Sequence, residues 1–379
     1  MDAWRKELQG RLKAREKEGL LRTLKYTSDQ IDFSSNDYLG LSRSESLFNE
    51  IHQELDALTI KRNGATGSRL LAGNTEYYEE TESRLAKIFK ADASLIFNSG
   101  YTANLAVLSS LPQRNDTILY DELAHACIKD GARLSLAKRY SFRHNDLNDL
   151  EAKLKRAEGK IYIAVESIYS MDGDQCPLQE LVSLSEKYNA FIILDEAHST
   201  GVMGEQGSGL AVSLNVHSKI AVRVYTFGKA MGIHGACVAG NNDLHDYLIN
   251  FARPFIYTTA LPPHSIAAID CAFKYLSNNI YLQERLRNNI QFFLHAVQDL
   301  PNRTISTSAI QTAIYPGNEN ARIAATELQQ KGFDVRPILS PTVPKGSERL
   351  RICLHTFNTK SDIEALASTL KSFQAVMHS

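Results

Sequence analysis

The run Phe-Ile-Ile-Leu-Asp-Glu-Ala-His, at Phe191–His198, decides the fold, because its apolar residues do not alternate with polar ones and they end at a carboxylate. A strand that is apolar at every position is buried on both faces, which is typical of a parallel sheet covered by helices. Ligands of such sheets bind beyond the carboxyl ends of the strands. Asp195 is therefore expected at a ligand-binding edge.

Similar short runs flank this segment and alternate with helical stretches. They are Ser94–Asn98, Thr117–Asp121, Ile161–Glu166, Arg223–Thr226 and Ala236–Ala239. Between two of the strands, the stretch Leu178–Tyr188 places its apolar residues on one face of a helix. Alternating strands and helices predict an α/β domain with a mostly parallel sheet.

The C-terminal part has a different pattern. After Pro262-Pro263, a long helical stretch is expected from His264 to Leu300. Shorter elements follow: a strand (Ala309–Tyr315), a helix (Asn320–Lys331) ended by Gly332, two strands (Phe333–Arg336 and Arg349–His355) and a helix (Ser361–Ser372) opened by a capping box at Ser361–Glu364. We expect an N-terminal helix and arm over 1–45, a large domain over 46–275 and a small α+β domain over 276–379.

The composition is that of an ordinary soluble protein: of 379 residues, 43% are hydrophobic and 22% charged, and the net charge is −1. That balance gives no electrostatic reason to expect nucleic acid or a membrane as partner, and no apolar run approaches the about 18 residues of a membrane span. The cysteines show no CxxC spacing and are Cys127, Cys176, Cys237, Cys271 and Cys353. We expect reduced thiols in a cytoplasmic protein, without a zinc site.

Lys229 lies in Val222–Gly232 (Val-Arg-Val-Tyr-Thr-Phe-Gly-Lys-Ala-Met-Gly), just after a strand and between two glycines. Most lysines in such a position are exposed charges in a turn, and that interpretation stays open for the residue taken alone. Asp195, however, closes another strand of the same series. An amine and a carboxylate at strand ends are the two groups that hold pyridoxal phosphate, one at its aldehyde and one at its ring nitrogen.

A phosphate site is predicted at Asn98–Asn104, where a strand, a Ser-Gly turn and a helix N-terminus follow one another. The free N–H groups and the dipole of a helix start favour an anion. Thr226 could give a hydroxyl to the same phosphate. Two histidines are candidates beside a pyridine ring. His125 could stack on the ring, although a structural role is the simpler interpretation for it, and His198 could contact the phenolic oxygen of the ring.

The residues Asp195–His198 also spell the DEAH tetrad of some helicases, which works together with a GxxxxGK[ST] phosphate loop. The pairs Gly159-Lys160 and Gly228-Lys229 are followed by Ile and Ala rather than by Ser or Thr. The sequence therefore does not support a helicase.

Five motifs occur in the order found in one enzyme family. They are Ser34–Gly40 (SSNDYLG), Gly67–Gly73 (GSRLLAG), Ser170–Asp174 (SMDGD), Asp195–His198 (DEAH) and Thr226–Lys229 (TFGK). From about Ser34 to the C-terminus the chain resembles the α-oxoamine synthases, pyridoxal-phosphate enzymes of the aspartate aminotransferase fold (fold type I).

The resemblance implies a homodimer with active sites at the subunit boundary. Lys229 would form a Schiff base with the cofactor, and Asp195 would pair with the ring nitrogen. His125 would stack on the ring, and His198 would contact its oxygen.

The other residues assigned by the resemblance surround the cofactor or the amino-acid substrate, and no metal ion is implied. The cofactor residues are Ser99, Gly100, Tyr101, Ser170 and Thr226, with Thr259 reaching the partner's phosphate. The substrate residues are Arg351, Ser68 and Asn36. Arg349 lies on the same strand face as Arg351, so the choice between them rests on the resemblance.

The implied reaction is the decarboxylative condensation of L-alanine with a pimeloyl thioester, carried by CoA or an acyl carrier protein, in biotin biosynthesis. Ser68 favours alanine over glycine, because relatives that use glycine tend to carry threonine there and serine leaves room for a methyl group. Glycine acetyltransferase, 5-aminolevulinate synthase and serine palmitoyltransferase remain alternatives. A non-catalytic regulatory subunit of this fold would be expected to lack the lysine.

The N-terminal segment carries Trp4, Leu8 and Leu12 at helical spacing, which predicts an amphipathic helix packed on the body of the protein rather than a targeting signal. Between Leu24 and Phe33 the chain is shorter than in relatives that carry a hairpin there. Arg22 is a candidate for the far carboxylate of a pimeloyl chain, although an exposed arginine after a helix is the simpler interpretation.

Overall fold

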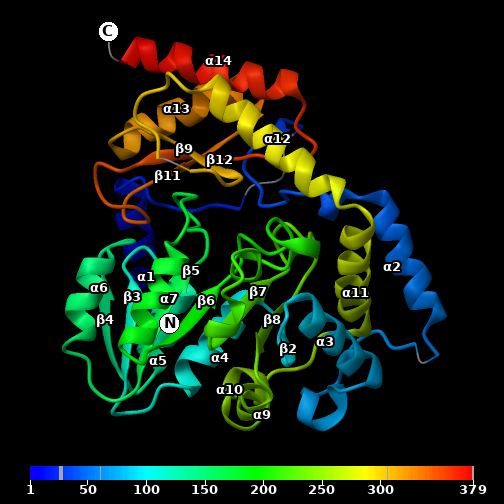
Figure 1. The fold of residues 1–379 in the computed structure, drawn as a ribbon. Coiled ribbons are helices and arrows are strands. Elements are labelled where there is room, and N and C mark those ends of the chain that lie inside the picture. Colours follow the sequence, from blue (N-terminus) through cyan, green and yellow to red (C-terminus); the bar gives the residue numbers. More distant parts are fainter. Residues whose placement is uncertain (25–28, 60, 305, 378–379) are drawn as a thin grey trace. The chain divides into compact units, whose positions relative to one another are not determined.

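A central sheet organises the computed structural model, which describes residues 1–24, 29–59, 61–304 and 306–377 (Figure 1). In this described part of the chain its seven strands lie in the order β2 (Ala93–Phe97), β8 (Ala236–Gly240), β7 (Val222–Thr226), β6 (Phe191–Asp195), β5 (Ile161–Glu166), β3 (Thr117–Asp121) and β4 (Lys138–Phe142). The strands from β7 to β4 are mutually parallel, whereas β8 runs antiparallel to both of its neighbours. The mostly parallel sheet predicted from the apolar runs is confirmed.

Successive residues of the strands enter different cores, which explains why the runs are apolar at every position. On β6, Ile193 packs with α4 (Gly100–Ser110), α5 (Ala126–Leu134), α9 (Asn242–Phe251) and α10 (Arg253–Ile256). Its neighbours Ile192 and Leu194 pack with α6 (Leu147–Leu154), α7 (Leu178–Lys187) and α8 (Leu210–Ser213). Helices therefore cover both faces, and the open edge at the carboxyl ends of the strands is left for polar residues.

The C-terminal part forms a smaller antiparallel sheet with β12 (Arg349–Cys353) between β11 (Arg336–Ile338) and β9 (Ile310–Ile314). Figure 1 shows α12 (Tyr281–Ala296), α13 (Asn318–Gln330) and α14 (Lys360–Met377) on one side of it. A short parallel pair, β1 (Ile31–Asp32) with β10 (Phe333–Asp334), ties the start of the body to this region. The motif that follows β1 is thereby brought to the small sheet.

The remaining helices are α2 (Glu45–Ala57), α3 (Glu76–Ile88) and α11 (Pro263–Asn278), whose apolar residues belong to the largest core. The helix α1 (Asp2–Lys17) forms as predicted within a separate compact unit, Met1–Gln30, and none of its side chains is buried. The other unit is Ile31–Ser379. The packing predicted for α1 and the domain boundaries expected near 45 and 275 stay predictions.

Several local expectations were wrong. The capping box lies two residues earlier than expected: Thr359 Oγ1 accepts from the Asp362 N–H, and the Asp362 carboxylate accepts from the Thr359 N–H. The helical stretch from His264 to Leu300 is divided into α11 and α12 at Asn279. The strand expected at Phe333–Arg336 is two short strands, β10 and β11. The strand β4 was not predicted, because this sheet edge is exposed and carries charged residues.

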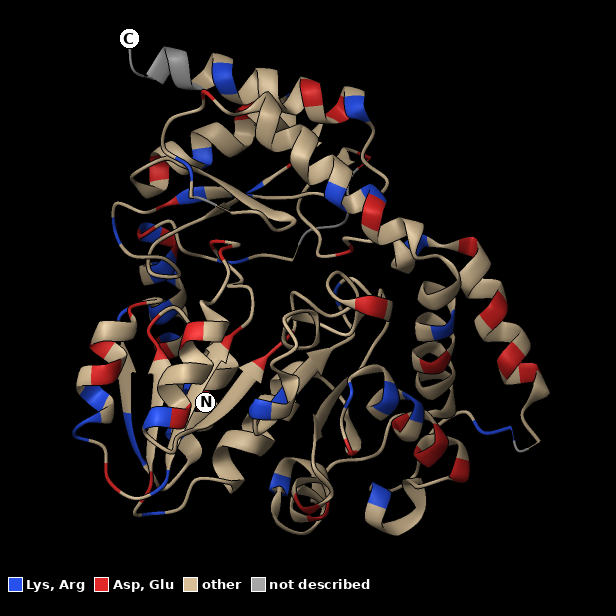
Figure 2. Cartoon of the chain, in the orientation of Figure 1, with Lys and Arg blue, Asp and Glu red and all other residues tan. Residues whose placement is uncertain are grey.

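Charged residues of both signs lie mainly on the helices and loops, and the middle strands are largely free of them (Figure 2). Within the described ranges, no helix is long and apolar enough to cross a membrane. The same part of the chain has no cluster of His, Cys, Asp or Glu suited to a metal ion.

His144 joins three segments at the carboxyl edge of the sheet. Its Nδ1 lies 3.0 Å from Asp121 Oδ1 at the end of β3, and its Nε2 lies 2.8 Å from Asp174 Oδ2 in the loop after β5. Burial alone would lower the pKa of His144, but the hydrogen bonds to the two carboxylates raise it to about 10. The protonated imidazole therefore holds both carboxylates at neutral pH.

We expect this ion pair to make the stability of the chain depend on alkaline pH. A histidine whose pKa is raised by folding contributes fully below its ordinary pKa of 6.5, and the contribution is lost as the pH rises toward about 10. The free energy of urea unfolding should fall across this window in the wild type and fall less in His144→Gln. His52→Gln, an exposed histidine on α2, is the control. Equal pH dependence in the wild type and His144→Gln would contradict the prediction.

Candidate active site

Asp195 is buried at the carboxyl end of β6, and two donors fix its carboxylate. Asn104 Nδ2 on α4 donates to Oδ2 at 2.7 Å, and the N–H of Ala197 donates to Oδ1 at 2.9 Å. Asn104 lies one turn after Gly100 on α4, so its side chain points back toward the start of the helix and the strand ends. The anion is held in one orientation, as required of a partner for a ring nitrogen.

Lys229 follows β7 at the same edge and is half-buried. Its Nζ lies 2.8 Å from His198 Nε2. Burial lowers the pKa of the Lys229 amine and the charge of Arg351 lowers it further, although Asp195 and Glu166 oppose the shift. An amine with a lowered pKa in a restricted site suits Schiff-base chemistry, so the structure does not support the alternative of a freely exposed turn.

A continuous series of hydrogen bonds runs from Lys229 to Arg351. Beyond Lys229, His198 Nδ1 lies 2.7 Å from the hydroxyl of Tyr38, and that hydroxyl lies 3.1 Å from Asn36 Oδ1. Arg351 Nη2 donates to the same Asn36 oxygen at 2.9 Å. Burial lowers the pKa of His198 well below its usual value, and the charges of Lys229 and Arg351 add to the effect. His198 is therefore neutral at physiological pH.

The structure distinguishes the two arginines of β12. Arg349 forms a buried ion pair with Asp172, so its charge is already neutralised. Arg351 instead donates to uncharged groups: Nε to the carbonyl of Ser170 at 2.7 Å, and Nη2 to Asn36. Its unneutralised charge also reaches Lys229 and His198. Arg351 is thus the arginine available to a substrate carboxylate beside Lys229.

The predicted phosphate turn is formed at the N-terminus of α4. Ser99 is the N-cap, and its Oγ accepts from the Thr102 N–H at 3.2 Å. A Cβ added to Gly100 would lie 2.0 Å from Thr226 Oγ1, so only glycine allows Thr226 to reach the helix start. Sequence-distant residues therefore converge here on one cradle of free N–H groups and a hydroxyl, which fits a phosphate.

His125 caps α5 and is exposed at the same edge of the sheet. Its backbone N–H donates to Glu166 Oε1 at 2.6 Å, and its ring Nδ1 lies 2.9 Å from Cys127 Sγ. Burial of part of the ring lowers its pKa, and Lys229 lowers it further. Burial and the neighbouring Asp195 raise the pKa of Glu166 to about 8. Stacking of His125 on a ring stays a prediction.

The structure shows the contacts of three further residues that are predicted to lie at the cofactor. The exposed Tyr101 directs its hydroxyl to Asp130 Oδ2 at 2.5 Å. The carbonyl of Thr259 accepts from Asn98 Nδ2 at 3.0 Å, beside the phosphate turn of its own chain. Ser170 is buried, and its carbonyl orients Arg351. Their contacts with a cofactor, and the reach of Thr259 into a partner subunit, stay predictions.

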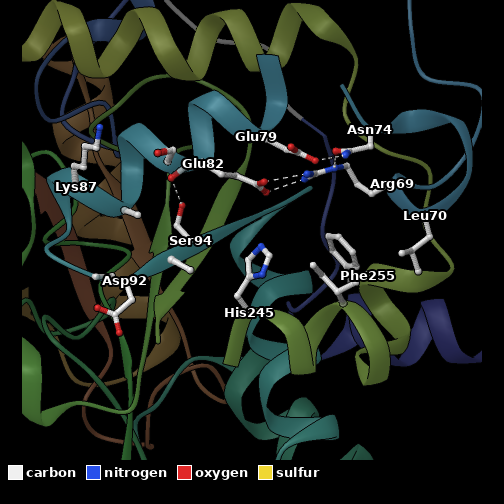
Figure 3. Close-up of a pocket in the computed structure, with 15 residues that line it drawn as sticks. Arg69, Leu70, Asn74, Glu79, Glu82, Lys87, Asp92, Ser94, His245 and Phe255 are labelled. Carbon is white, nitrogen blue, oxygen red and sulfur yellow. Dashed lines mark hydrogen bonds and ion pairs between the residues drawn. The ribbon is translucent and has the colours of Figure 1, made fainter. Parts of the chain in front are cut away.

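Ser68 begins the tight turn Arg69–Gly73, and its carbonyl accepts from Leu71 and Gly73. In the described residues, no hydrogen bond joins Ser68 to Lys229 or Arg351. The turn is fixed through Arg69, which donates to both carboxylate oxygens of Glu82 at 2.7 and 2.9 Å (Figure 3). This pair lies beside a pocket of about 420 Å³ (Figure 3), and none of the residues that line the pocket is a predicted site residue.

Two expectations concern the N-terminal unit. Arg22 is exposed after α1, and its role toward a pimeloyl chain stays a prediction. The shortened stretch between Leu24 and Phe33 includes residues 25–28, which lie outside the described residues.

Residues that sequence reasoning left without a role complete the site: Tyr38, Asn104, Glu166 and Cys127. Tyr38 stands inside the motif Ser34–Gly40, and Asn104 lies one helical turn after Gly100. Glu166 ends a strand in the way that Asp195 does. A search for polar residues at strand ends and near the starts of helices would have found Asn104 and Glu166.

The group implied by these residues is pyridoxal phosphate, and the residues fit it. The amine of Lys229 is suited to bind the aldehyde of the cofactor, and the fixed carboxylate of Asp195 is suited to pair with its ring nitrogen. The helix start at Gly100, together with the hydroxyl of Thr226, is suited to bind its phosphate.

Comparison with known proteins gives one family. The family described as aminotransferase class I and II matches residues 28–370. The 8-amino-7-oxononanoate synthase of Emericella nidulans is 40% identical over 371 residues, covering 91% of this chain and 90% of that protein.

Two solved structures are similar over most of their length. The 8-amino-7-oxononanoate synthase of Francisella tularensis has a TM-score of 0.80 at 30% identity, covering 92% of this chain and 99% of that one. A serine palmitoyltransferase of S. paucimobilis, with a bound PLP–myriocin aldimine, has a TM-score of 0.88 at 25% identity, covering 98% and 97%. The fold expected from the motifs is therefore confirmed.

We expect Gly100→Ala to weaken binding of pyridoxal phosphate by roughly tenfold or more, the size expected when a charged group loses one or two hydrogen bonds. The added Cβ would displace Thr226 Oγ1 from the helix start. Affinity is measured by fluorescence titration of the cofactor-free chain, and thermal unfolding of the same sample checks that it is folded. Gly10→Ala, whose Cβ would meet nothing within 4 Å, is the control. A Gly100→Ala chain with unchanged affinity would overturn the assignment.

Proposed function

Since the chain belongs to the class I and II aminotransferase family, we propose that it is an α-oxoamine synthase that condenses L-alanine with a pimeloyl thioester. The products are 8-amino-7-oxononanoate, carbon dioxide and the free thiol of the carrier, as a step of biotin biosynthesis. The observation that carries the proposal is the approach of Lys229 to His198 at the strand edge where Asp195 also lies, with Arg351 of β12 near enough for its charge to lower the pKa of Lys229. The cofactor of this family is pyridoxal phosphate.

Arg351 and Asn36 bind the amino acid. Arg351 is buried and fixed by the Ser170 carbonyl, so its guanidinium is oriented before substrate arrives. A planar guanidinium binds a carboxylate through two parallel hydrogen bonds, which orients the substrate as well as holding it. The α-carbon of the amino acid is thereby directed toward Lys229.

Lys229 moves the α-hydrogen. Burial lowers the pKa of its amine, so a larger fraction of the side chain is neutral and able to accept a proton at physiological pH. Bound pyridoxal phosphate supplies an electron sink for the charge left on the α-carbon. Asp195, whose carboxylate is fixed by Asn104 and the Ala197 N–H, would hold the ring nitrogen of that cofactor.

Alanine is proposed over glycine and serine, with Ser68 bordering the methyl group. One methyl group discriminates by only about 1–3 kcal/mol, so the preference is expected to be partial. Serine palmitoyltransferase is the main alternative, since the structure of the S. paucimobilis enzyme is similar to this chain over 97% of that enzyme's length. The identity of 40% to an 8-amino-7-oxononanoate synthase, against 25% to that structure, favours the alanine enzyme.

We also propose a homodimer in which Thr259 of each subunit contacts the phosphate site of the other. A cytoplasmic location is proposed because all five cysteines are unpaired and buried, as expected in a reducing compartment.

The substrate assignment predicts the outcome of a screen of amino acids and acyl donors. Alanine, glycine and serine are each incubated with pimeloyl-CoA, acetyl-CoA, succinyl-CoA and palmitoyl-CoA, and free thiol and carbon dioxide are quantified. We expect the highest kcat/KM for alanine with pimeloyl-CoA, and a pimeloyl carrier protein is then compared with it. A clear preference for glycine with a short acyl-CoA, or for serine with palmitoyl-CoA, would replace this function with a sibling one.

Lys229→Ala should reduce turnover by more than roughly 10³-fold, since both the covalent attachment and the proton acceptor are lost. The variant should also lose the visible absorbance of the covalently held cofactor after gel filtration. Lys219→Ala removes an exposed lysine that pairs with Glu186 and serves as the control. Full activity in a colourless Lys229→Ala preparation would refute the assignment.

A further inference from the structure

The backbone of His125 is held by a carboxyl group that has no part in the proposed mechanism. Glu166 ends β5, 41 residues further along the chain, and its Oε1 lies 2.6 Å from the backbone nitrogen of His125. A backbone N–H can only donate, so the direction of this bond is fixed and Oε1 is the acceptor. Glu166 is 2% exposed, so water does not readily replace its oxygen.

This bond ties the histidine to the central sheet. In the described part of the chain, the other hydrogen bonds of His125 join it to residues of the first turn of α5: Cys127, Ile128 and Lys129. Those bonds hold His125 to its own helix. The bond to Glu166 instead fixes it relative to β5, which is paired with β6 and has Glu166 in register with Asp195.

The tie is made through the backbone and leaves the imidazole ring free. His125 is exposed at the carboxyl edge of the sheet, whereas Glu166 and Asp195 are buried. An exposed ring on an anchored backbone can meet a flat ligand with little further loss of freedom. Because Asp195 is suited to the ring nitrogen of pyridoxal phosphate, a tie to the neighbouring strand holds His125 at a fixed position relative to that group.

We propose that Glu166 is a positioning residue: by accepting the backbone N–H of His125 it holds the imidazole where pyridoxal phosphate binds, and this role needs the acceptor oxygen of Glu166 but not its charge. The inference rests on the proposed function, in which this edge binds that cofactor. It gives the predicted stacking of His125 a structural cause, because the ring makes the stack and the backbone carries the support.

A charge on Glu166 is unfavourable in this position. Burial and the neighbouring Asp195 raise its pKa to about 8, although Lys229 and the His125 N–H oppose the shift. The other titratable groups that face it are Asp121 on β3, Cys127 on α5 and Tyr169 after β5. The group is therefore largely neutral at pH 7, with its hydrogen on Oε2, because Oε1 accepts. A glutamine reproduces it, with an oxygen at Oε1 and an NH₂ group in place of the hydroxyl.

The contact is tested by NMR on the full-length, cofactor-free chain labelled with ¹⁵N-histidine. The backbone amide of His125 is identified by its absence in His125→Ala. We expect its proton to be shifted downfield by the hydrogen bond and to titrate with a midpoint of about pH 8 in the wild type. Glu166→Gln should keep the downfield shift and lose the titration, whereas Glu166→Met should lose both. An amide unaffected by either substitution would overturn the proposal.

The role is tested by fluorescence titration of the cofactor-free chain with pyridoxal phosphate. Glu166→Met removes the acceptor and should weaken binding by roughly two- to tenfold, the size expected for one aromatic ring contact. Glu166→Asp keeps the acid but withdraws its oxygens by one methylene, so it should weaken binding similarly. Glu166→Gln should bind like the wild type. Unchanged affinity in Glu166→Asp together with a loss in Glu166→Gln would show that the charge matters, and would contradict the proposal.

Glu122→Met is the matched control for these variants. The exposed Glu122 accepts the backbone N–H of another histidine, His144, at 3.2 Å, so the substitution removes the same kind of contact from a residue without a role at the cofactor. Its affinity for pyridoxal phosphate should equal that of the wild type. Thermal unfolding of each sample checks that the chain is folded. An equal loss in Glu122→Met and Glu166→Met would overturn the proposal.

A double-mutant cycle shows whether Glu166 acts through the ring of His125. His125→Ala removes the ring and keeps the backbone N–H, so Glu166→Met should change the affinity by less than about twofold in that background. Additive losses would mean that Glu166 acts elsewhere in the site and would overturn the proposal. Failure of the proposed function has a different signature: the wild type would release no thiol from pimeloyl-CoA with alanine, while the affinities of the variants would still support or contradict the role of Glu166.

Discussion

The burial of the Lys229 amine beside two carboxylates is the constraint on which the site depends. Removal from water favours the neutral amine, whereas Asp195 and Glu166 favour the ammonium form, and the balance lowers the pKa. A lysine at a surface turn would remain protonated and could neither attack an aldehyde nor accept a proton. The same burial raises the pKa of Glu166 to about 8, so the two carboxylates do not carry full charges side by side at neutral pH.

The parallel sheet is what makes this concentration of polar groups possible. Parallel pairing brings the carboxyl ends of β5, β6 and β7 to one edge, and Glu166 is in register with Asp195. The rest of the site arrives from sequence-distant segments. The N–H of Cys353 donates to the Phe33 carbonyl at 2.8 Å, which fixes β12 against the chain leading to Asn36 and Tyr38. The residues proposed to bind substrate and to move a proton are consequently parts of one hydrogen-bonded unit.

The central sheet could be predicted from the sequence, because strands buried on both faces are apolar at every position. The exposed strand β4 could not, since its Lys138, Arg139 and Tyr140 face solvent and give no apolar pattern. The division between α11 and α12 was missed for a related reason. Apolar residues continue on both sides of Asn279, and the break comes from local backbone geometry rather than from a change in hydrophobicity.

The sequence predicts a site residue where its type and its place at a strand end already indicate its chemistry. It does not do so where the role depends on a contact with a residue far away in the sequence. Lys229 and Asp195 stand out at strand ends, but a two-residue period places Arg349 and Arg351 on the same face of β12. Their difference depends on Asp172, nearly two hundred residues earlier in the chain, which neutralises Arg349. An arginine already held by a buried carboxylate would have to break that pair to bind a second one, at a cost of about 3–5 kcal/mol. Arg351 bears no such cost, because it donates to the uncharged Ser170 carbonyl and Asn36 amide, which leaves its charge available for the substrate carboxylate that it is proposed to bind.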